Sequence, residues 1–293
     1  MFENIKITNI DSLYTAMINI LTPKFGRNEA REIVRLIFLD LKGWSASDII
    51  VNGNISVSDY LLECIEKIIT RIMNDEPVQY VTGKAHFHGL IFDVNPSVLI
   101  PRPETDALVD MIIDENDRSD LKILDIGTGS GCIAISLARS LPFCDVTAID
   151  ISPRAIETAS KNSVRLKTNV NFIVADIFKK DDFGNDEFDI IVSNPPYIDD
   201  KEKSGMDRNV LEYEPHSALF VPDDDPIRFY IRIGLIASKS LKKGGKLYFE
   251  INPLHHIEIC EYLSGLDFVD IKVIKDYFGK DRFISATRGK KHG

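Results

Sequence analysis

The sequence of 293 residues lacks several features that mark whole classes of protein. Its four cysteines, Cys64, Cys132, Cys144 and Cys260, form no CxxC pair and have no histidine at zinc-ligand spacing. A zinc knuckle is therefore not expected. Scattered single cysteines in a chain of this length are typical of reduced thiols in a cytosolic protein. We expect no metal site and a cytoplasmic location.

Targeting and membrane signals are also missing. The first residues, Met1-Phe2-Glu3-Asn4, carry no basic stretch followed by an apolar one, so we expect no signal peptide. No apolar run approaches the ~18 residues that a transmembrane helix needs. There is no internal repeat and no low-complexity segment. These absences predict a soluble protein that does not engage a membrane.

The chain has fewer basic than acidic residues. The chain has 35 Lys and Arg against 45 Asp and Glu, a net charge of −10. A phosphate backbone repels such a chain overall, which disfavours non-specific nucleic-acid binding but leaves a local basic patch possible. The apolar and charged fractions, 44% and 27%, are ordinary for globular proteins. The length predicts about two domains.

Residues 1–75 are expected to form a small all-α domain. Apolar residues recur at helical spacing over residues 30–41 and 61–72, with charged residues between them. Another helix is predicted over residues 11–21, ended by Pro23. These stripes predict core packing and carry no catalytic cluster.

A β-hairpin linker over residues 76–105 and a larger α/β domain over residues 106–293 are expected to follow. Gly89 and Asn95-Pro96 are turn signals in the linker. The alternation of strands and helices predicts a mostly parallel sheet with helices on both faces. The predicted strands are 121–126, 145–149, 171–175, 188–193, 246–251, 267–274 and 282–287, and the predicted helices are 104–114, 133–138, 153–162 and 227–241.

A glycine-rich turn, Asp125-Ile126-Gly127-Thr128-Gly129-Ser130-Gly131, joins the first strand of the larger domain to its helix. Glycine lacks a Cβ and adopts positive φ, so a ligand can lie against this backbone at a helix N-terminus. Residues 129–134 also match the G-x-G-x-x-A dinucleotide fingerprint. A tight turn without a ligand is the alternative.

Acidic residues end the next two predicted strands. Asp150 stands where a carboxylate accepts hydrogen bonds from ribose hydroxyls in doubly wound folds. This suits NAD and the adenosine of S-adenosylmethionine equally, and a 2′-phosphate poorly. Asp176 could accept the amino group of an adenine, with Ile177 packing on the ring. Either carboxylate could instead serve only as a helix cap.

The most specific motif, Asn194-Pro195-Pro196-Tyr197, follows the fourth strand directly. Two prolines stiffen the backbone and remove two N–H donors, which leaves carbonyl oxygens pointing outward. With the side-chain oxygen of Asn194, two acceptors can hold both hydrogens of an –NH₂ group. The Tyr197 ring is expected to stack on a planar substrate or lie near a cation. A simple Pro-Pro turn is the alternative.

This motif resembles that of methyltransferases acting on planar amino or amide nitrogens, which include DNA adenine methyltransferases and the release factor glutamine methyltransferases (the PrmC/HemK family). Four further segments resemble signatures of the latter, in the same order. They are Glu76-Pro77-Val78-Gln79-Tyr80-Val81-Thr82-Gly83, Leu99-Ile100-Pro101-Arg102-Pro103-Glu104-Thr105, Glu214-Pro215-His216-Ser217-Ala218-Leu219 and residues 241–251. The resemblance covers residues 27–287.

The resemblance implies a class I methyltransferase fold, with a Rossmann-like, mostly parallel seven-stranded sheet and a small all-α N-terminal domain that docks the substrate. It implies S-adenosylmethionine as cofactor and, as substrate, the glutamine of the Gly-Gly-Gln motif in a class 1 peptide-chain release factor. The implied catalytic residues are Asn194, Pro195, Pro196 and Tyr197. The implied cofactor-binding residues are Asp125, Gly127, Thr128, Gly129, Ser130, Gly131, Asp150, Asp176, Ile177 and Asn194.

Three segments depart from the family pattern. Residues 220–225 replace a Gly-rich stretch, residues 252–255 replace a glycine and a downstream glutamine, and Ile177 stands where a tryptophan sometimes follows the third-strand acid. Three other functions stay open. A DNA adenine methyltransferase should carry a basic target-recognition region, a nicotinamide-dependent oxidoreductase leaves residues 194–197 unexplained, and a non-catalytic binding module should have lost a motif residue.

Overall fold

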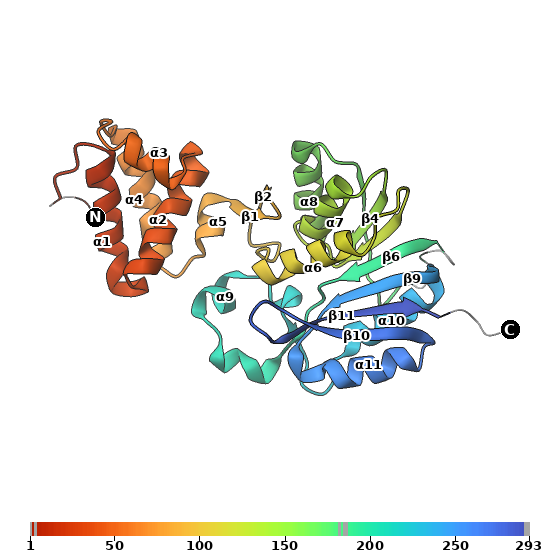
Figure 1. Ribbon diagram of the computed structural model, residues 1–293. Coiled ribbons are helices and arrows are strands. Elements are labelled where there is room, and N and C mark those ends of the chain that lie inside the picture. Colours follow the sequence, from red (N-terminus) through yellow and green to blue (C-terminus); the bar gives the residue numbers. More distant parts are fainter. Residues whose placement is uncertain (1, 3–4, 181–182, 184–186, 290–293) are drawn as a thin grey trace. The chain divides into compact units, whose positions relative to one another are not determined.

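The computed structural model describes residues 2, 5–180, 183 and 187–289, which fold as two units (Figure 1). Unit 1 contains Met1–Lys84 and Arg208–Tyr213, and unit 2 contains Ala85–Asp207 and Glu214–Gly293. The expected linker over residues 76–105 is thus divided between the units. Helix α5 (Val78–Thr82) belongs to unit 1 because Arg71 of that unit donates to the Val81 carbonyl oxygen at 3.2 Å.

Unit 1 is helical, as its periodicity predicts. Its other helices are α1 (Ile10–Phe25), α2 (Arg27–Lys42), α3 (Ala46–Val51), α4 (Asp59–Met73) and α9 (Arg208–Tyr213). Their apolar stripes meet in one core that includes Leu13, Ile37 and Ile69. The expectation that Pro23 ends the first helix is wrong, since α1 continues to Phe25. Pro23 lies in the last turn, where the helix has little length left to disrupt.

Helix α9 lies far along the chain yet belongs to unit 1. The Tyr213 hydroxyl donates to the Asn74 carbonyl oxygen at 2.8 Å, and an Arg208 guanidinium nitrogen lies 3.8 Å from a carboxylate oxygen of Asp75. Both partners follow the end of α4 directly. The segment between the Asn-Pro-Pro-Tyr motif and Glu214 therefore contributes one helix to the N-terminal unit.

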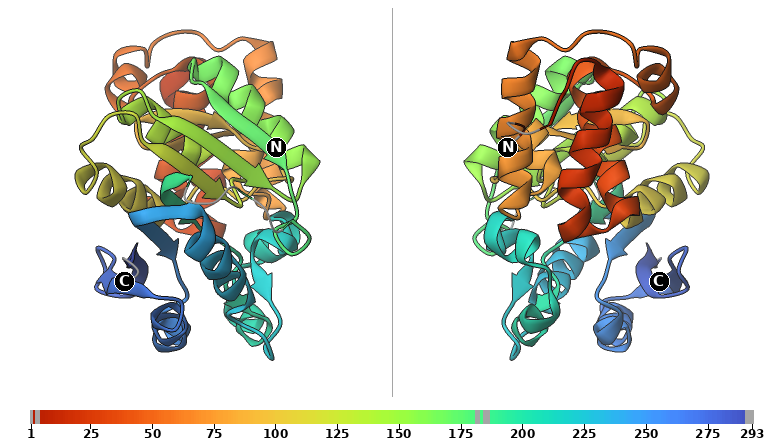
Figure 2. Two further views of the ribbon diagram at one scale, coloured as in Figure 1. Left: turned by 90° about the vertical axis from the view of Figure 1, so that its right-hand side faces the viewer. Right: turned by 90° about the vertical axis from the view of Figure 1, so that its left-hand side faces the viewer.

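Unit 2 is built on a seven-stranded sheet, which confirms the predicted fold class. The strand order is β10-β11-β9-β6-β3-β4-β5, and β11 alone runs opposite to the other six strands. The strands are β3 (Lys122–Ile126), β4 (Asp145–Asp150), β5 (Val170–Val174), β6 (Phe188–Ser193), β9 (Leu241–Glu250), β10 (Phe268–Lys275) and β11 (Asp281–Arg288). Figure 2 shows the twist that accumulates across the sheet.

Helices cover this sheet from both sides (Figure 1). Helices α6 (Pro103–Asp114), α7 (Cys132–Ser140) and α8 (Pro153–Leu166) pack beside one another, and α10 (Arg228–Ser240) and α11 (His256–Ser264) pack beside one another on the other side. From β3 the chain proceeds one way through β4 and β5, and then returns to the other side of β3 with β6. Such a reversal opens a crevice at the carboxyl ends of the strands.

A two-stranded hairpin, β1 (Lys84–Phe87) and β2 (Leu90–Asp93), precedes α6. The turn falls at the predicted turn signal Gly89 and at His88 before it, and both residues have positive φ. Short elements complete the described residues: β7 (Ile198–Asp199), β8 (Phe220–Val221) and three 3₁₀ turns, Asp200–Gly205, His216–Ala218 and Pro253–His255.

Asn162 of α8 connects the hairpin to the glycine-rich turn. Its side chain is fully buried, accepts from the Asp93 backbone N–H at 2.7 Å, and donates to the carbonyl oxygens of Asp93 and Ser130, both at 3.0 Å. One side-chain amide thus satisfies three backbone groups from two segments. The turn is held in place by a residue that never touches the crevice.

We expect Asn162→Ala to lower the free energy of unfolding by at least about 2 kcal/mol, because buried backbone groups lose their partners. Lys161→Ala, at an exposed neighbouring position of the same helix, should change it by less than about 0.5 kcal/mol. Denaturant unfolding of both variants measures the difference. Equal stability of the two variants would contradict the bridging role.

Candidate active site

A pocket of about 520 Å³ lies at the carboxyl ends of the central strands of unit 2. Each of four successive parallel strands contributes residues to its wall from the loop that follows it. The predicted site residues among them are Gly127, Gly129, Asp150, Asp176, Ile177, Asn194, Pro195 and Pro196. The sheet therefore gathers residues spread over some seventy positions of the chain at one edge, as the strand order requires.

Asp150 closes the glycine-rich turn against the second strand. One carboxylate oxygen accepts from the Gly129 backbone N–H at 2.9 Å, and the other accepts from the Ser152 backbone N–H at 2.8 Å. Burial raises the pKa of Asp150, and these two hydrogen bonds oppose that rise. Each oxygen keeps a further acceptor site, so the carboxylate can still take hydrogen bonds from a pair of hydroxyls in the pocket.

Asp176 lines the same pocket from the loop that follows β5. It accepts from the Phe178 backbone N–H at 2.9 Å, and this hydrogen bond lowers the pKa of its carboxyl group. Ile177 beside it is buried and lines the pocket. The carboxylate is therefore ionised at neutral pH and can accept a hydrogen bond from an amino group, next to an apolar surface.

An aromatic wall beside Asp176 was missed by the sequence reasoning. Phe178 and Phe229 pack edge to face with ring centroids 5.3 Å apart, and the Arg228 guanidinium lies 4.9 Å from the Phe178 ring. All three residues line the pocket. No short-range signal marks this pair, because its two rings come from the loop after β5 and from α10. The pocket gains a surface on which a planar ring can pack.

Four predicted cofactor-binding residues lie beneath the pocket rather than in its wall. Asp125, Thr128 and Ser130 are buried, and the Thr128 hydroxyl donates to an Asp125 carboxylate oxygen at 2.6 Å. Gly131 has φ +82°, and a Cβ there would lie 2.9 Å from the Ile135 side chain. These residues fix the shape of the turn, whereas Gly127 and Gly129 reach the pocket.

Tyr197 also lies outside the residues that line the pocket. Its ring packs against the core of unit 2, and its hydroxyl donates to a carboxylate oxygen of Glu250 at 3.0 Å. Burial raises the pKa of this phenol. The structure thus gives the Tyr197 hydroxyl a partner that the sequence did not suggest, and it does not place the ring as a wall beside a bound substrate.

The backbone around Asn194 is held from three sides. The Ser193 hydroxyl donates to the Ile126 carbonyl oxygen at 2.6 Å, which joins the ends of β6 and β3. The backbone N–H groups of Tyr197 and Ile198 both donate to the Leu219 carbonyl oxygen, at 3.2 and 2.9 Å. The Asn252 side chain donates to the Tyr197 carbonyl oxygen at 3.0 Å. The departure over residues 252–255 thus supplies a contact to this segment.

Two of the signature segments meet at a buried carboxylate. Glu214 accepts from the Ile100 backbone N–H at 3.2 Å and from the Arg102 guanidinium at 2.6 Å, and its side chain is 1% exposed. This pairing positions the loop whose residues Val98 and Leu99 line the pocket. The loop is a part of the site that sequence reasoning did not assign.

Asn194 and Pro195 both line the pocket, and each carries an acceptor, the side-chain Oδ1 of Asn194 and the carbonyl oxygen of Pro195. Within the part of the chain that the structure describes, no group donates to the Asn194 Oδ1 or to the Pro195 carbonyl oxygen. Asn194 uses its Nδ2 as a donor to the Thr105 hydroxyl at 3.1 Å. The wall can therefore receive a group with two N–H donors.

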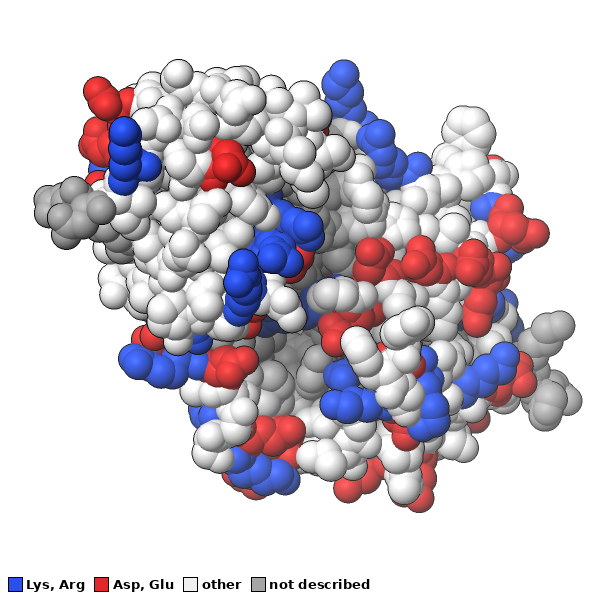
Figure 3. Space-filling view, turned by 60° about the vertical axis from the view of Figure 1, so that its left-hand side comes forward, with Lys and Arg blue, Asp and Glu red and all other residues white. Residues whose placement is uncertain are grey.

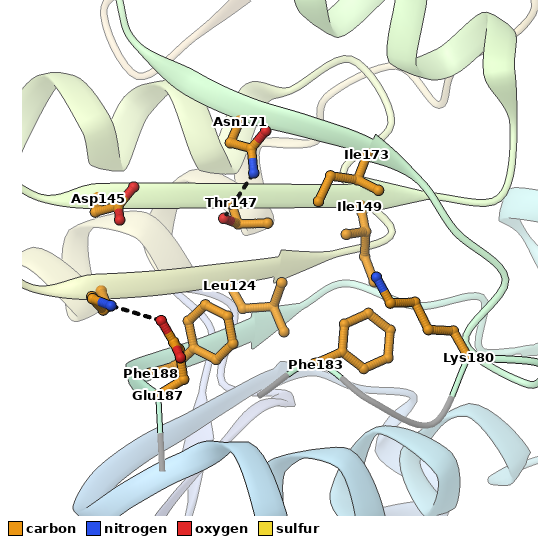
Figure 4. A pocket seen from close by; sticks show the side chains of 11 residues that line it. Leu124, Asp145, Thr147, Ile149, Asn171, Ile173, Lys180, Phe183, Glu187 and Phe188 are labelled. Carbon is orange, nitrogen blue, oxygen red and sulfur yellow. Dashed lines mark hydrogen bonds and ion pairs between the residues drawn. The ribbon is translucent and has the colours of Figure 1, made fainter. Parts of the chain in front are cut away.

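A second pocket, of about 360 Å³, lies on the face of the sheet rather than at its edge (Figure 4). Leu124, Ile149 and Ile173 line it, and two pairs of its polar side chains interact, Lys122 with Glu187 at 2.6 Å and Asn171 with Thr147 at 3.5 Å. Among the described residues, the strand-end carboxylates Asp150 and Asp176, the glycine-rich turn and the Asn-Pro-Pro segment line the first pocket and not this one. We therefore assign the site to the edge of the sheet.

His88, Asp106 and Asp110 form one cluster of potential metal ligands among the described residues. The Asp106 carboxylate accepts from the His88 backbone N–H at 3.1 Å and lies 2.6 Å from its Nδ1. These two contacts hold the left-handed His88 at the hairpin turn against α6. This hydrogen bonding accounts for the cluster without a metal ion.

Burial raises the pKa of Asp125 to about 7, so its proton is bound more tightly in the folded chain than in the unfolded chain, where the pKa is about 3.9. The folded state therefore loses up to about 4 kcal/mol of stability from this group as pH rises from about 4 to about 7. Asp125→Asn cannot titrate. Between pH values of about 4 and about 7, the free energy of unfolding of Asp125→Asn should therefore rise relative to that of wild type. Denaturant unfolding of both proteins across this range measures the difference. A difference that does not change with pH would contradict the prediction.

Two family models match parts of this chain. A model described as the PrmC N-terminal domain matches residues 22–83, and a model described as a methyltransferase domain matches residues 117–252. A solved methyltransferase from Pyrococcus furiosus shares the fold at 22% identity, with a TM-score of 0.52 over 75% of this chain and 98% of that one. No helix among the described residues is long and apolar enough to cross a lipid bilayer.

Relatives of known name share most of their length with this chain. The release factor glutamine methyltransferase of Bacteroides thetaiotaomicron is 47% identical over 260 residues, which cover 89% of this chain and 93% of that protein. That of Flavobacterium psychrophilum is 42% identical over 282 residues, covering 95% and 99%. These identities, over most of both chains, show that the chain belongs to the release factor glutamine methyltransferase family.

Proposed function

We propose that this chain transfers a methyl group from S-adenosylmethionine to the side-chain amide nitrogen of the glutamine in the Gly-Gly-Gln motif of a class 1 release factor. The observation that carries the proposal is the acceptor pair formed by Asn194 Oδ1 and the Pro195 carbonyl oxygen at the pocket wall. A primary amide has two N–H donors on one nitrogen, which matches this pair. The product would be N5-methylglutamine, in support of translation termination in the cytoplasm.

The residues present fit the proposed cofactor. Gly127 and Gly129 carry no Cβ where their backbone meets the pocket, Asp150 can accept from ribose hydroxyls, and Asp176 can accept from an adenine amino group. Ile177 and Phe178 offer apolar surface for a purine ring. When bound, S-adenosylmethionine supplies an electrophilic methyl group on a sulfonium sulfur.

The chemical difficulty lies in the amide, because its nitrogen lone pair is delocalised into the carbonyl group. The amide rotation barrier of roughly 18–20 kcal/mol gauges this delocalisation. Two hydrogen bonds to Asn194 and Pro195 would fix the nitrogen and favour its pyramidal form, in which the lone pair is available. Holding the reactants in place can contribute ~7–11 kcal/mol. A strong base is not needed before transfer, since the alkylated nitrogen loses its proton readily.

Two other activities fit the site less well. A hydride-transferring enzyme would use the glycine-rich turn and Asp150 but gives the acceptor pair no role. A DNA adenine methyltransferase would use the acceptor pair but needs a basic surface for the duplex. On the face shown in Figure 3, Lys and Arg side chains are intermingled with Asp and Glu side chains. The net charge of −10 also favours a protein substrate.

The direct test is incubation of the full chain with labelled S-adenosylmethionine and purified release factor, followed by mass-spectrometric mapping of the methyl group. We expect one methyl group on the glutamine of the Gly-Gly-Gln motif and none on duplex DNA supplied in parallel. A methyl group on adenine, or no transfer to the release factor, would overturn the proposal.

Asn194→Ala should lower turnover about a hundredfold or more, the scale seen when one preorganised polar contact to a reacting group is removed. Asp145→Ala, at the exposed amino end of β4, serves as the matched control and should turn over normally. Near wild-type turnover by Asn194→Ala would show that another acceptor holds the amide.

We also propose that the helical unit docks the release factor, since a family model named for the N-terminal domain matches residues 22–83. Hydrogen exchange of the full chain should show slower exchange in α1–α4 when release factor is added. A short Gly-Gly-Gln peptide should leave these amides unchanged. Identical exchange in the helical unit with and without whole release factor would refute a docking role.

A further inference from the structure

The side chain of Asn194 can present either of two chemically opposite faces to the pocket. Its amide group has an oxygen acceptor on one side and an NH₂ donor on the other, and a half-turn exchanges them. Only the oxygen can receive an N–H of a substrate amide. With the NH₂ turned toward the pocket, two donors would face each other. The proposed function therefore requires something behind Asn194 to choose the face.

A buried hydrogen-bonded chain lies behind Asn194. Its Nδ2 donates to the Thr105 hydroxyl oxygen at 3.1 Å, and the Thr105 hydroxyl donates to a Glu250 carboxylate oxygen at 2.7 Å. Thr105 is 2% exposed and Glu250 is 1% exposed. Thr105 directly follows the Pro103-Glu104 start of α6, and Glu250 ends β9, so three signature segments meet here.

The direction of this chain follows from the number of hydrogens available. A threonine hydroxyl has one hydrogen, and a charge-assisted hydrogen bond to a carboxylate is the strongest use of it. Once that hydrogen is given to Glu250, the Thr105 oxygen can only accept. It therefore requires a donor from Asn194, which turns Nδ2 inward and leaves Oδ1 on the pocket side.

Two hydroxyl groups share the carboxylate of Glu250. Its second carboxylate oxygen accepts from the Tyr197 hydroxyl at 3.0 Å, so both oxygens act as acceptors. Burial raises the pKa of Glu250, while the hydrogen bonds from Thr105 and Tyr197 and the positive charge of Arg282 oppose that rise. A protonated carboxyl group would have to give up one of these two donors.

We propose that Glu250 is a positioning residue for methyl transfer, which acts through Thr105 to hold the Asn194 side-chain oxygen toward the substrate amide. The same carboxylate fixes the Tyr197 hydroxyl, so one buried side chain anchors both ends of the Asn-Pro-Pro-Tyr segment. The role rests on the proposed function. It gives Tyr197 a purpose in keeping with its place outside the pocket wall.

The test compares two substitutions of Thr105 in the full chain. Thr105→Val keeps the shape but removes the hydroxyl, and Thr105→Ser keeps the hydroxyl. We expect kcat for release factor methylation to fall about tenfold or more in Thr105→Val and to stay within about threefold of wild type in Thr105→Ser. KM for the release factor and the Kd of S-adenosylhomocysteine should change little, because Asn194 alone changes its orientation.

A double-mutant cycle separates positioning from a structural role. If Thr105 acts only through Asn194, Thr105→Val should have no further effect on kcat in an Asn194→Ala background, whereas independent structural damage would add to it. Glu250→Gln, in which the new NH₂ can donate to Thr105 and free its hydroxyl hydrogen for Asn194, should show the same loss and the same lack of additivity. If Thr105→Val does not fold, the double-mutant cycle can be measured with Glu250→Gln in its place.

Three results would overturn the positioning role: wild-type kcat in Thr105→Val and Glu250→Gln, equal losses in Thr105→Val and Thr105→Ser, or full additivity with Asn194→Ala. These outcomes are distinguishable from failure of the proposed function. Wild-type enzyme assayed first either methylates the release factor or does not, and the comparison of variants uses only the ratio of their rates to that of wild type.

Discussion

The reversal of strand order at β3 is the constraint on which the site depends. Strands β4 and β6 pair with opposite edges of β3. The loops after four parallel strands therefore converge on one crevice. Each loop then needs only one or two suitable residues. Glycines let the backbone of the first loop reach the pocket, and carboxylates end the second and third strands. The fourth loop carries acceptors because its prolines have no N–H to offer.

Much of this was predictable because the signals are local. The alternation of apolar strands and amphipathic helices predicts the sheet. The order of its strands then explains why residues as far apart in sequence as Gly127 and Pro196 line one pocket. Asp150 and Asp176 are recognisable from their places at strand ends, since Asp150 is the last residue of β4 and Asp176 lies two positions after β5. The acceptor character of Asn194 and Pro195 is contained in four consecutive residues. Their position at the pocket wall agrees with that interpretation.

What sequence reasoning could not supply are contacts between residues far apart in the chain. Thr105 and Glu250 are separated by 145 positions, and Ile100 and Glu214 by 114, so no spacing connects them. Tyr197 was expected to face the substrate since a ring beside an amide site suggests stacking, yet its hydroxyl is bound to Glu250. Helix α9 joins unit 1 through Tyr213 and Arg208, a pairing that only the folded chain reveals.

The central claim is that the site recognises a primary amide by its two N–H groups, with the face of Asn194 chosen from behind. A crystal structure of the enzyme with S-adenosylhomocysteine and release factor tests it most directly. The account predicts the substrate amide nitrogen within about 3.2 Å of both Asn194 Oδ1 and the Pro195 carbonyl oxygen, with Asn194 Nδ2 on Thr105. A substrate amide held by other acceptors, or an Asn194 NH₂ turned toward the substrate, would contradict it.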